Sequence, residues 1–249
     1  MKGSAYLGVL VCIAVICASF PVSTASITSP QGTFKIGYNL FALPAIPLWD
    51  GVSGRAPGYP PSVLDEYDRI PKRAGLDFRK LSRWDSAKQQ YVIFDEHRPA
   101  SFGNLSVGDG YAINLIMRDS SRVSFNGISE NDTADMWISL PKAGWTLIGY
   151  PHSYPSPDPY PGPPYYVGTP YYWADVKVTD GIETKSLRDA SQYGANWLSS
   201  VALWYDNTSG REVTLGLPDD NPDEQSLIGW HGYWVRTYKD DLALIFEAP

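Results

Sequence analysis

The sequence predicts an all-β protein with a minor helical part, built from two similar units in tandem. Aromatic residues make up 14% of the 249-residue chain, which also contains 21 prolines and 22 glycines. This composition is typical of short strands joined by many turns. Several stretches recur in the same order along the chain, and such self-similarity outweighs local signals in naming an architecture. We therefore predict two β-sandwich or β-barrel-like units with a pseudo-two-fold relation and one short helix per unit.

Three pairs of similar stretches carry the predicted duplication. Residues 37–44 (Gly-Tyr-Asn-Leu-Phe-Ala-Leu-Pro) resemble 144–151 (Gly-Trp-Thr-Leu-Ile-Gly-Tyr-Pro), and 105–112 resemble 227–234 without a gap. Between them, Arg83-Trp84-Asp85 resembles Leu203-Trp204-Tyr205-Asp206. Unit one is placed in residues 26–130 and unit two in residues 131–249. The spacing between the stretches is longer in unit two, and most of the excess lies in a Pro/Tyr-rich insertion at residues 151–173.

The first 25 residues are predicted to be a secretory signal peptide. An apolar run at residues 6–20 is followed by small residues that end at Ala25, where a signal peptidase would cut. The run is too short for a transmembrane helix, so no membrane span is expected after cleavage. Both cysteines, Cys12 and Cys17, would leave with the signal peptide. The mature chain is therefore expected to be secreted, extracellular or at the cell surface, and to fold without a disulfide.

In unit one, short apolar runs closed by glycine or proline predict the strands. A helix is expected to start at Ser62, because this serine can cap it and Asp65 lies in its first turn. The expected strands are residues 33–36, 38–43, a hairpin of 78–85 with 91–94, 110–117 and 122–125.

Unit two repeats this order. A short helix is expected at residues 184–193, where Gly194 would end it. The expected strands are residues 137–140, 145–150, 173–178, a hairpin of 198–205 with 212–215, and a closing hairpin of 232–238 with 242–247.

The paired stretches resemble a known kind of repeat. A Gly-Trp-x-Leu-Ile-x-x-Pro strand followed by a Gly-x-Gly-Tyr-Trp strand, in tandem behind a signal peptide, is similar to β-repeat modules of uncharacterised secreted or surface proteins of prokaryotes. The resemblance spans nearly all of residues 33–247. Unit one departs from it at Tyr38 and Ala112, and unit two has Trp230 where unit one has Gly108. The resemblance implies an extracytoplasmic β-domain, and it transfers no catalytic residue.

Charge and motifs exclude several classes of function. The net charge of −7 and a pI near 4.9 disfavour nucleic acid and anionic membranes as partners. The sequence has no HExxH, GxSxG, Walker A or CxxC motif, so no catalytic residue, metal site or cofactor is predicted. Residues 219–224 place oxygen ligands at alternate positions, but Glu224 stands where a calcium loop needs glycine. A solvated acidic turn is the favoured interpretation, and calcium binding is the alternative.

The aromatic residues fall into two groups. Trp84, Trp204, Tyr111, Tyr233 and Trp234 recur in both units and are predicted to lie in the core or at its edge. The aromatic residues of the insertion do not recur, so the shared core does not need them. Six of these seven residues are the candidate ligand-binding residues: Tyr160, Tyr165, Tyr166, Tyr171, Tyr172 and Trp173. A proline-stiffened segment loses little entropy on binding, which favours a binding surface; the alternative is that it covers an edge of unit two.

Together these patterns predict a secreted, non-catalytic binding or structural module. Its expected partner is an extracellular protein or a carbohydrate, and self-association is a further option. The alternatives are a carbohydrate-binding protein that uses exposed aromatic residues, a subunit of an extracellular assembly, and a polysaccharide-acting hydrolase. Hydrolysis would need two carboxylates about 5–10 Å apart across a cleft, and no pair stands out in the sequence.

Overall fold

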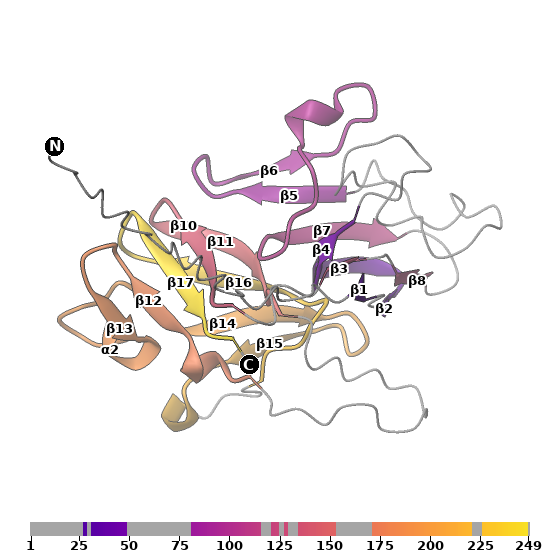
Figure 1. Ribbon diagram of the computed structural model, residues 1–249. Helices are drawn as coiled ribbons and strands as arrows, with labels where there is room; N and C mark the ends of the chain where they lie inside the picture. The colour runs from indigo at the N-terminus through magenta and orange to yellow at the C-terminus, as the bar shows by residue number, and fades with distance from the viewer. Residues whose placement is uncertain are drawn as a thin grey trace, which may run out of the picture.

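The computed structural model describes residues 27–28, 31–48, 81–115, 121–124, 127–128, 134–152, 171–220 and 226–248. Within these residues the chain forms antiparallel β-sheets with one short α-helix, as the sequence predicts (Figure 1). The helix expected from Ser62 and residues 153–170 of the insertion lie outside the described residues.

Unit one contains a four-stranded sheet with the order β3-β7-β5-β6. Its strands are β3 (Gly37–Ala42), β7 (Gly110–Leu115), β5 (Leu81–Asp85) and β6 (Gln90–Ile93). Unit two contains a sheet with the order β11-β16-β14-β15. Its strands are β11 (Gly144–Gly149), β16 (Gly232–Thr237), β14 (Leu198–Asp206) and β15 (Arg211–Leu215). We call these the sheet of unit one and the sheet of unit two.

The two sheets share strand register as well as strand order. Phe41 pairs with Tyr111 between β3 and β7, and Ile148 pairs with Tyr233 between β11 and β16, each one residue from the end of the pairing. Each tyrosine hydroxyl accepts a 2.7 Å hydrogen bond from a backbone N–H five residues earlier, that of Ser106 or Ile228. Shared order and register are what a duplicated unit predicts. The pseudo-two-fold relation between whole units stays a prediction.

The other strands form three further sheets of two to four strands. In unit two, β10 (Met136–Leu140), β17 (Leu242–Phe246), β12 (Lys177–Thr179) and β13 (Thr184–Ser186) pair in the order β10-β17-β12-β13. In unit one, β2 (Gln31–Phe34) pairs with β8 (Ser121–Ser124), and β9 (Gly127–Ile128) lies between β1 (Ile27–Thr28) and β4 (Ile46–Pro47).

The expected closing hairpin of residues 232–238 with 242–247 is wrong. Both strands exist, but β16 belongs to the sheet of unit two and β17 pairs with β10 and β12. The physical reason is burial, because both strands carry apolar residues that must face one core. Val235 of β16 and Leu244 of β17 are fully buried in the same cluster. Unit two therefore has the two-layer arrangement of a sandwich.

Two further elements of unit two differ from expectation. The expected strand at 173–178 begins with a 3₁₀ turn, Trp173–Asp175, and only Lys177–Thr179 pairs as a strand. The expected helix at 184–193 is shorter, because α2 spans Leu187–Ser191 and the three residues before it form β13. Its start is set by Ser186, whose hydroxyl accepts a 3.1 Å hydrogen bond from the N–H of Asp189.

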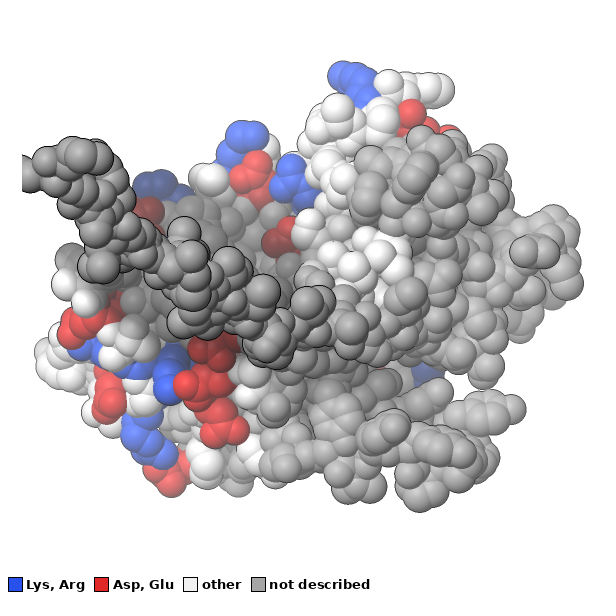
Figure 2. All heavy atoms as spheres, in the orientation of Figure 1, with Lys and Arg blue, Asp and Glu red and all other residues white. Residues whose placement is uncertain are grey.

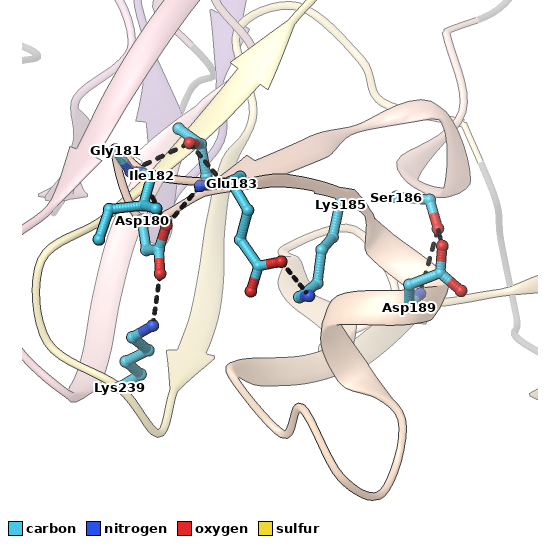
Figure 3. A network of polar contacts seen from close by, with 9 residues as sticks. Asp180, Gly181, Ile182, Glu183, Lys185, Ser186, Asp189 and Lys239 are labelled. Atoms are coloured by element: carbon cyan, nitrogen blue, oxygen red, sulfur yellow. Dashed lines mark hydrogen bonds and ion pairs between the residues drawn. The ribbon is translucent and has the colours of Figure 1, made fainter.

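A polar network holds the β12–β13 turn (Figure 3). Asp180 accepts 2.9 Å hydrogen bonds from the N–H groups of Ile182 and Glu183, and it binds the Lys239 ammonium at 2.7 Å. These bonds hold the pKa of the Asp180 carboxyl well below its usual range. Lys185 pairs with Glu183 at 2.8 Å. Figure 2 shows acidic and basic side chains intermingled over β12, β13 and α2, so this part of the visible face is not a patch of one sign.

Candidate functional site

The sheet of unit one and the sheet of unit two pack against each other through a small apolar cluster. We call this contact the junction. Each unit contributes an apolar residue from its first strand, its second strand and its third strand. The buried members are Leu40, Ala112 and Leu147, and the half-buried ones are Trp84, Tyr205 and Trp234.

Backbone bonds also cross the junction in matched pairs. The N–H of Ala42 donates to the carbonyl of Trp230 at 3.2 Å, and the N–H of Gly149 donates to the carbonyl of Gly108 at 2.8 Å. Trp230 and Gly108 occupy equivalent places and have φ values of 68° and 86°. Unit two therefore keeps the left-handed backbone without glycine, a conformation that is uncommon for a bulky residue.

Five aromatic side chains gather at one end of the junction, and we call them the aromatic cluster. They come from strands of both units: Tyr38 of β3, Trp84 of β5, Tyr91 of β6, Trp145 of β11 and Trp234 of β16. The ring centroids of Trp84 and Trp234 lie 5.1 Å apart, and that of Tyr91 is 5.0 Å from Trp84, both in edge-to-face contact. Tyr38 and Tyr91 share a 2.8 Å hydrogen bond between their hydroxyls. Tyr38, Tyr91 and Trp145 are 38%, 42% and 36% exposed.

Strand periodicity explains why these rings share a surface. Side chains two positions apart on a strand point to the same face. Tyr38 therefore lies on the same face as Leu40, and Trp145 lies on the same face as Leu147. The leucines are buried at the junction, and the aromatic residues continue its apolar face towards solvent. The Arg236 guanidinium lies 5.6 Å from the centre of the Trp145 ring, on the strand paired with it.

Unit one holds the backbone of Trp145 in place. The indole N–H of Trp84 donates to the Trp145 carbonyl at 2.6 Å, and the Gln89 side chain bonds both the carbonyl and the N–H of Trp145 at 2.9 Å. Gln89 lies in the β5–β6 turn and has a positive φ of 52°. The cluster is thus assembled on backbone of both units, and unit one holds the strand that carries Trp145.

A cleft of about 280 Å³ opens beside the cluster. It is bounded by the end of β5 with its turn, the start of β7, the end of β10 and the middle of β11. Its polar and aromatic walls include Arg83, Trp84, Asp85, Asp109 and Ser139. The Asp109 residue is exposed, yet desolvation by the surrounding protein raises the pKa of its carboxyl. The charge of Arg83 and a hydrogen bond from the Tyr111 hydroxyl oppose this effect. Desolvation would raise the pKa of Asp85, but the side chain and the backbone N–H of Lys88 together lower it below its usual value.

The equivalent positions of unit two are filled by two stacked rings. Strand pairing places Ser82 opposite Ala112 and Leu203 opposite Trp234, so the next residues, Arg83 and Trp204, are equivalent. The bridges Asp109–Ile148 and Phe41–His231 likewise make Asp109 equivalent to His231. The rings of Trp204 and His231 stack at 4.3 Å with an interplanar angle of 27°. Unit one therefore has a guanidinium and a carboxylate where unit two has a ring stack.

This register corrects one detail of the sequence comparison. Trp84 and Trp204 lie on equivalent strands, but Trp84 matches Tyr205 and not Trp204. A one-residue offset moves a side chain to the other face of a strand. Trp84 therefore faces the junction, while Trp204 packs against the core of unit two. Tyr111 and Tyr233 are fully buried, and Trp84, Trp204 and Trp234 lie at the edge of the core, as predicted.

His231 is expected to make stability depend on pH. Desolvation lowers its pKa from 6.5 to about 4, with Asp206 opposing, and its Nδ1 has no hydrogen-bond partner among the described residues. The unfolded chain therefore binds the proton first as pH falls. Stability is fully present above pH 6.5 and is lost between pH 6.5 and about 4, by at most about 3 kcal/mol.

Urea unfolding at pH 7.5, 5.5 and 4 measures this loss. His231→Phe keeps a ring on Trp204 but cannot be protonated, so its unfolding free energy should fall less over the same range. Equal losses in the wild type and in His231→Phe would show that His231 is not the group responsible.

The structure describes three of the six sequence-predicted binding residues, and these three differ in exposure. Tyr160, Tyr165 and Tyr166 lie outside the described residues. Tyr172 is 39% exposed, and Tyr171 is half-buried, with its ring 5.5 Å from that of Tyr150. Trp173 is fully buried, and its indole N–H donates to the carbonyl of Ser200 at 2.9 Å.

The assignment of Trp173 to the binding surface is therefore wrong. This residue packs into the core of unit two, although the matched stretches of unit one have no counterpart for it. Sequence reasoning missed the aromatic cluster instead. The available signal was the spacing of Tyr38 from Leu40 and of Trp145 from Leu147, which places each aromatic ring on the apolar face of its strand.

Among the described residues, no group of three or more His, Cys, Asp or Glu side chains could hold a metal ion. Asp219 of the acidic turn pairs with Arg188 at 2.7 Å, and residues 221–225 of that turn lie outside the described part. No helix among the described residues is both long and apolar enough to cross a membrane.

No protein-family model matches the chain, and neither a curated protein nor a solved structure shows significant similarity to it. The fold and the aromatic cluster define the class of this protein. It is an all-β protein with an exposed aromatic surface where two similar sheets meet.

Proposed function

We propose that this protein is a secreted, non-catalytic binding module of the extracellular space or cell surface, and that it binds carbohydrate at the aromatic cluster. The observation that carries the proposal is the cluster itself. Five aromatic rings from both units meet there, and Tyr38, Tyr91 and Trp145 each expose more than a third of their surface. Exposed rings gathered in one place offer apolar surface that the core does not use, because burial is what makes an aromatic ring stabilising.

Carbohydrate suits this surface chemically. A pyranose ring has an apolar C–H face that packs on an aromatic ring, while its hydroxyls need hydrogen-bond partners at the rim. The hydroxyls of Tyr38 and Tyr91 and the guanidinium of Arg236 lie at the cluster to supply them. Rings that already touch each other edge-to-face lose little freedom when a ligand binds. A net charge of −7 also disfavours strongly anionic polymers.

Trp145→Ala is expected to weaken carbohydrate binding at least tenfold, which corresponds to about 1.4 kcal/mol or more. Removing the indole deletes the exposed ring but keeps the backbone atoms that Trp84 and Gln89 bind, so the fold should survive. A glycan array of the mature protein selects the ligand, and isothermal titration calorimetry then compares the variant with the wild type.

Trp137→Ala is the matched control, because Trp137 is 61% exposed on β10 and has no ring contact with the cluster. Its affinity should equal that of the wild type. Equal losses in both variants would contradict a site at the cluster, and a chain that binds no glycan would contradict the proposed function.

A polysaccharide-acting hydrolase is the second candidate. Asp85 and Asp109 line one cleft, and their pKa values move in opposite directions, as an acid and a base require. Asp85, however, accepts a 3.1 Å hydrogen bond from the turn N–H of Lys88, and Asp206 accepts the equivalent 3.2 Å bond from the N–H of Ser209 in unit two. A shared turn contact explains Asp85 without catalysis. New reducing ends released from the bound glycan would favour the hydrolase.

A further inference from the structure

We infer that the cleft beside β5 binds a single sugar ring of a neutral oligosaccharide, whose neighbouring units lie on the aromatic cluster. This inference rests on the proposed carbohydrate binding and adds to it a second subsite and a ligand class. Trp84 connects the two places, because it belongs to the aromatic cluster and also lines the cleft.

The size of the cleft limits the ligand. The volume of about 280 Å³ lies just below the usual range for small-molecule sites, so the cleft admits one ring and not an extended chain. Both units contribute walls: Arg83, Asp85 and Asp109 from unit one, and Ser139 and Leu147 from unit two. A ligand bound there would therefore contact both units.

The charges of the cleft favour a neutral, hydroxyl-rich ring. Asp109 offers a carboxylate that accepts hydrogen bonds from hydroxyls. Arg83 is held in place, because its Nε–H donates to the Phe102 carbonyl at 2.6 Å and its guanidinium lies 5.9 Å from the centre of the Phe102 ring. The charge of Asp85 is offset by Lys88, whose ammonium lies 3.2 Å from it. One carboxylate and one guanidinium thus remain, and they balance.

Unit two offers no equivalent subsite. The rings of Trp204 and His231 occupy the positions that Arg83 and Asp109 hold in unit one, and they stack on each other at 4.3 Å. Hydroxyls would find neither a carboxylate nor a guanidinium there. We therefore expect one oligosaccharide per chain, although the two sheets share strand order and register.

The test uses neutral oligosaccharides of two to six units, namely β-1,4-linked glucose, mannose and N-acetylglucosamine, with oligogalacturonate as the anionic counterpart. Calorimetry on the full mature chain should show at least one neutral series binding with one site per chain, and no binding of oligogalacturonate. Asp109→Asn should weaken that binding at least tenfold. Glu96→Gln removes a charge from an exposed loop, and it should change nothing.

A second variant guards against a folding defect in Asp109→Asn. Ser139→Phe places a ring in the cleft from an exposed position on β10 and leaves Asp109 intact, so it should also weaken binding. Melting curves of both variants identify any loss of fold.

The outcomes separate this inference from the proposed function. Loss of binding in Trp145→Ala, with wild-type affinity in both cleft variants, would overturn the cleft subsite and keep the aromatic site. Tighter binding of oligogalacturonate than of every neutral series, or two sites per chain, would also overturn it. Binding of none of these sugars, with a blank glycan array, would overturn both.

Discussion

Trp173→Ala is expected to lower the free energy of unfolding by about 3–5 kcal/mol, the usual cost of deleting a large buried aromatic side chain. Trp173 is fully buried in the core cluster of unit two, to which Val176 and Leu187 also belong. The mutation also leaves the Ser200 carbonyl without the indole N–H that now donates to it at 2.9 Å. Urea unfolding monitored by far-UV circular dichroism measures the change.

Three other variants set the scale for Trp173→Ala. Trp204→Ala should cost less, because Trp204 is half-buried and its indole N–H has no hydrogen-bond partner among the described residues. Trp137→Ala should be nearly neutral, because that side chain is 61% exposed. Trp173→Phe should fall between Trp173→Ala and the wild type. If Trp204→Ala cost more than Trp173→Ala, Trp173 would belong to a binding surface after all.

The recurring stretches allowed the strands of the two main sheets to be predicted from the sequence. Both β3 and β11 begin with glycine, and both β7 and β16 begin with a Gly-Tyr pair. These residues occupy equivalent positions in the strand pairing of the two sheets. These residues do the same physical work twice, since the tyrosines fill the cores and their hydroxyls bind backbone N–H groups at 2.7 Å. Such local constraints leave a trace in the sequence.

Which strands pair with each other, and to which face of a strand a side chain points, were harder to predict from the sequence. The turn after β16 looks like a hairpin turn, yet β17 pairs with β10 and β12, because a strand's neighbour depends on which layer buries its apolar face. Trp84 and Trp204 are the same residue type in similar stretches, which suggested that their positions are equivalent. Successive side chains of a strand point to opposite faces, however, so an offset of one residue changes the face. Only the pairing partners revealed that Tyr205 is the counterpart of Trp84.

The candidate site was the least predictable part. Recurrence marked Trp84 and Trp234 as core residues, and both do lie against the apolar junction. Their contact with each other at 5.1 Å arises only because the two sheets pack face to face. The binding site was predicted in the insertion because of its unusual composition, whereas Trp173 at the end of the insertion is buried in the core. Composition indicates which segment is unusual, and it does not indicate which side chains face solvent.

Gly149→Ala is expected to destabilise the protein by about 3 kcal/mol or more, at the upper end of the cost of overpacking. A Cβ atom on Gly149 would lie 2.1 Å from the Cβ of Ala42 and 3.2 Å from the Asp109 carbonyl oxygen. These atoms belong to short side chains or backbone and cannot swing away. The N–H of Gly149 also donates to the Gly108 carbonyl at 2.8 Å, so the strand cannot retreat without breaking a bond across the junction.

The measurement is the free energy of unfolding in urea, together with the affinity for the glycan that the wild type binds. Gly229→Ala is the matched control, because among the described residues a Cβ there would meet only Pro44, at an ordinary 3.6 Å. It should leave stability within about 1 kcal/mol of the wild type, as expected for substitutions that create neither clash nor cavity. Gly149→Ala should lose affinity as well as stability, because the aromatic cluster and the cleft both depend on how closely the two sheets approach. A Gly149→Ala protein as stable as the Gly229→Ala control would show that the two sheets do not meet at this glycine.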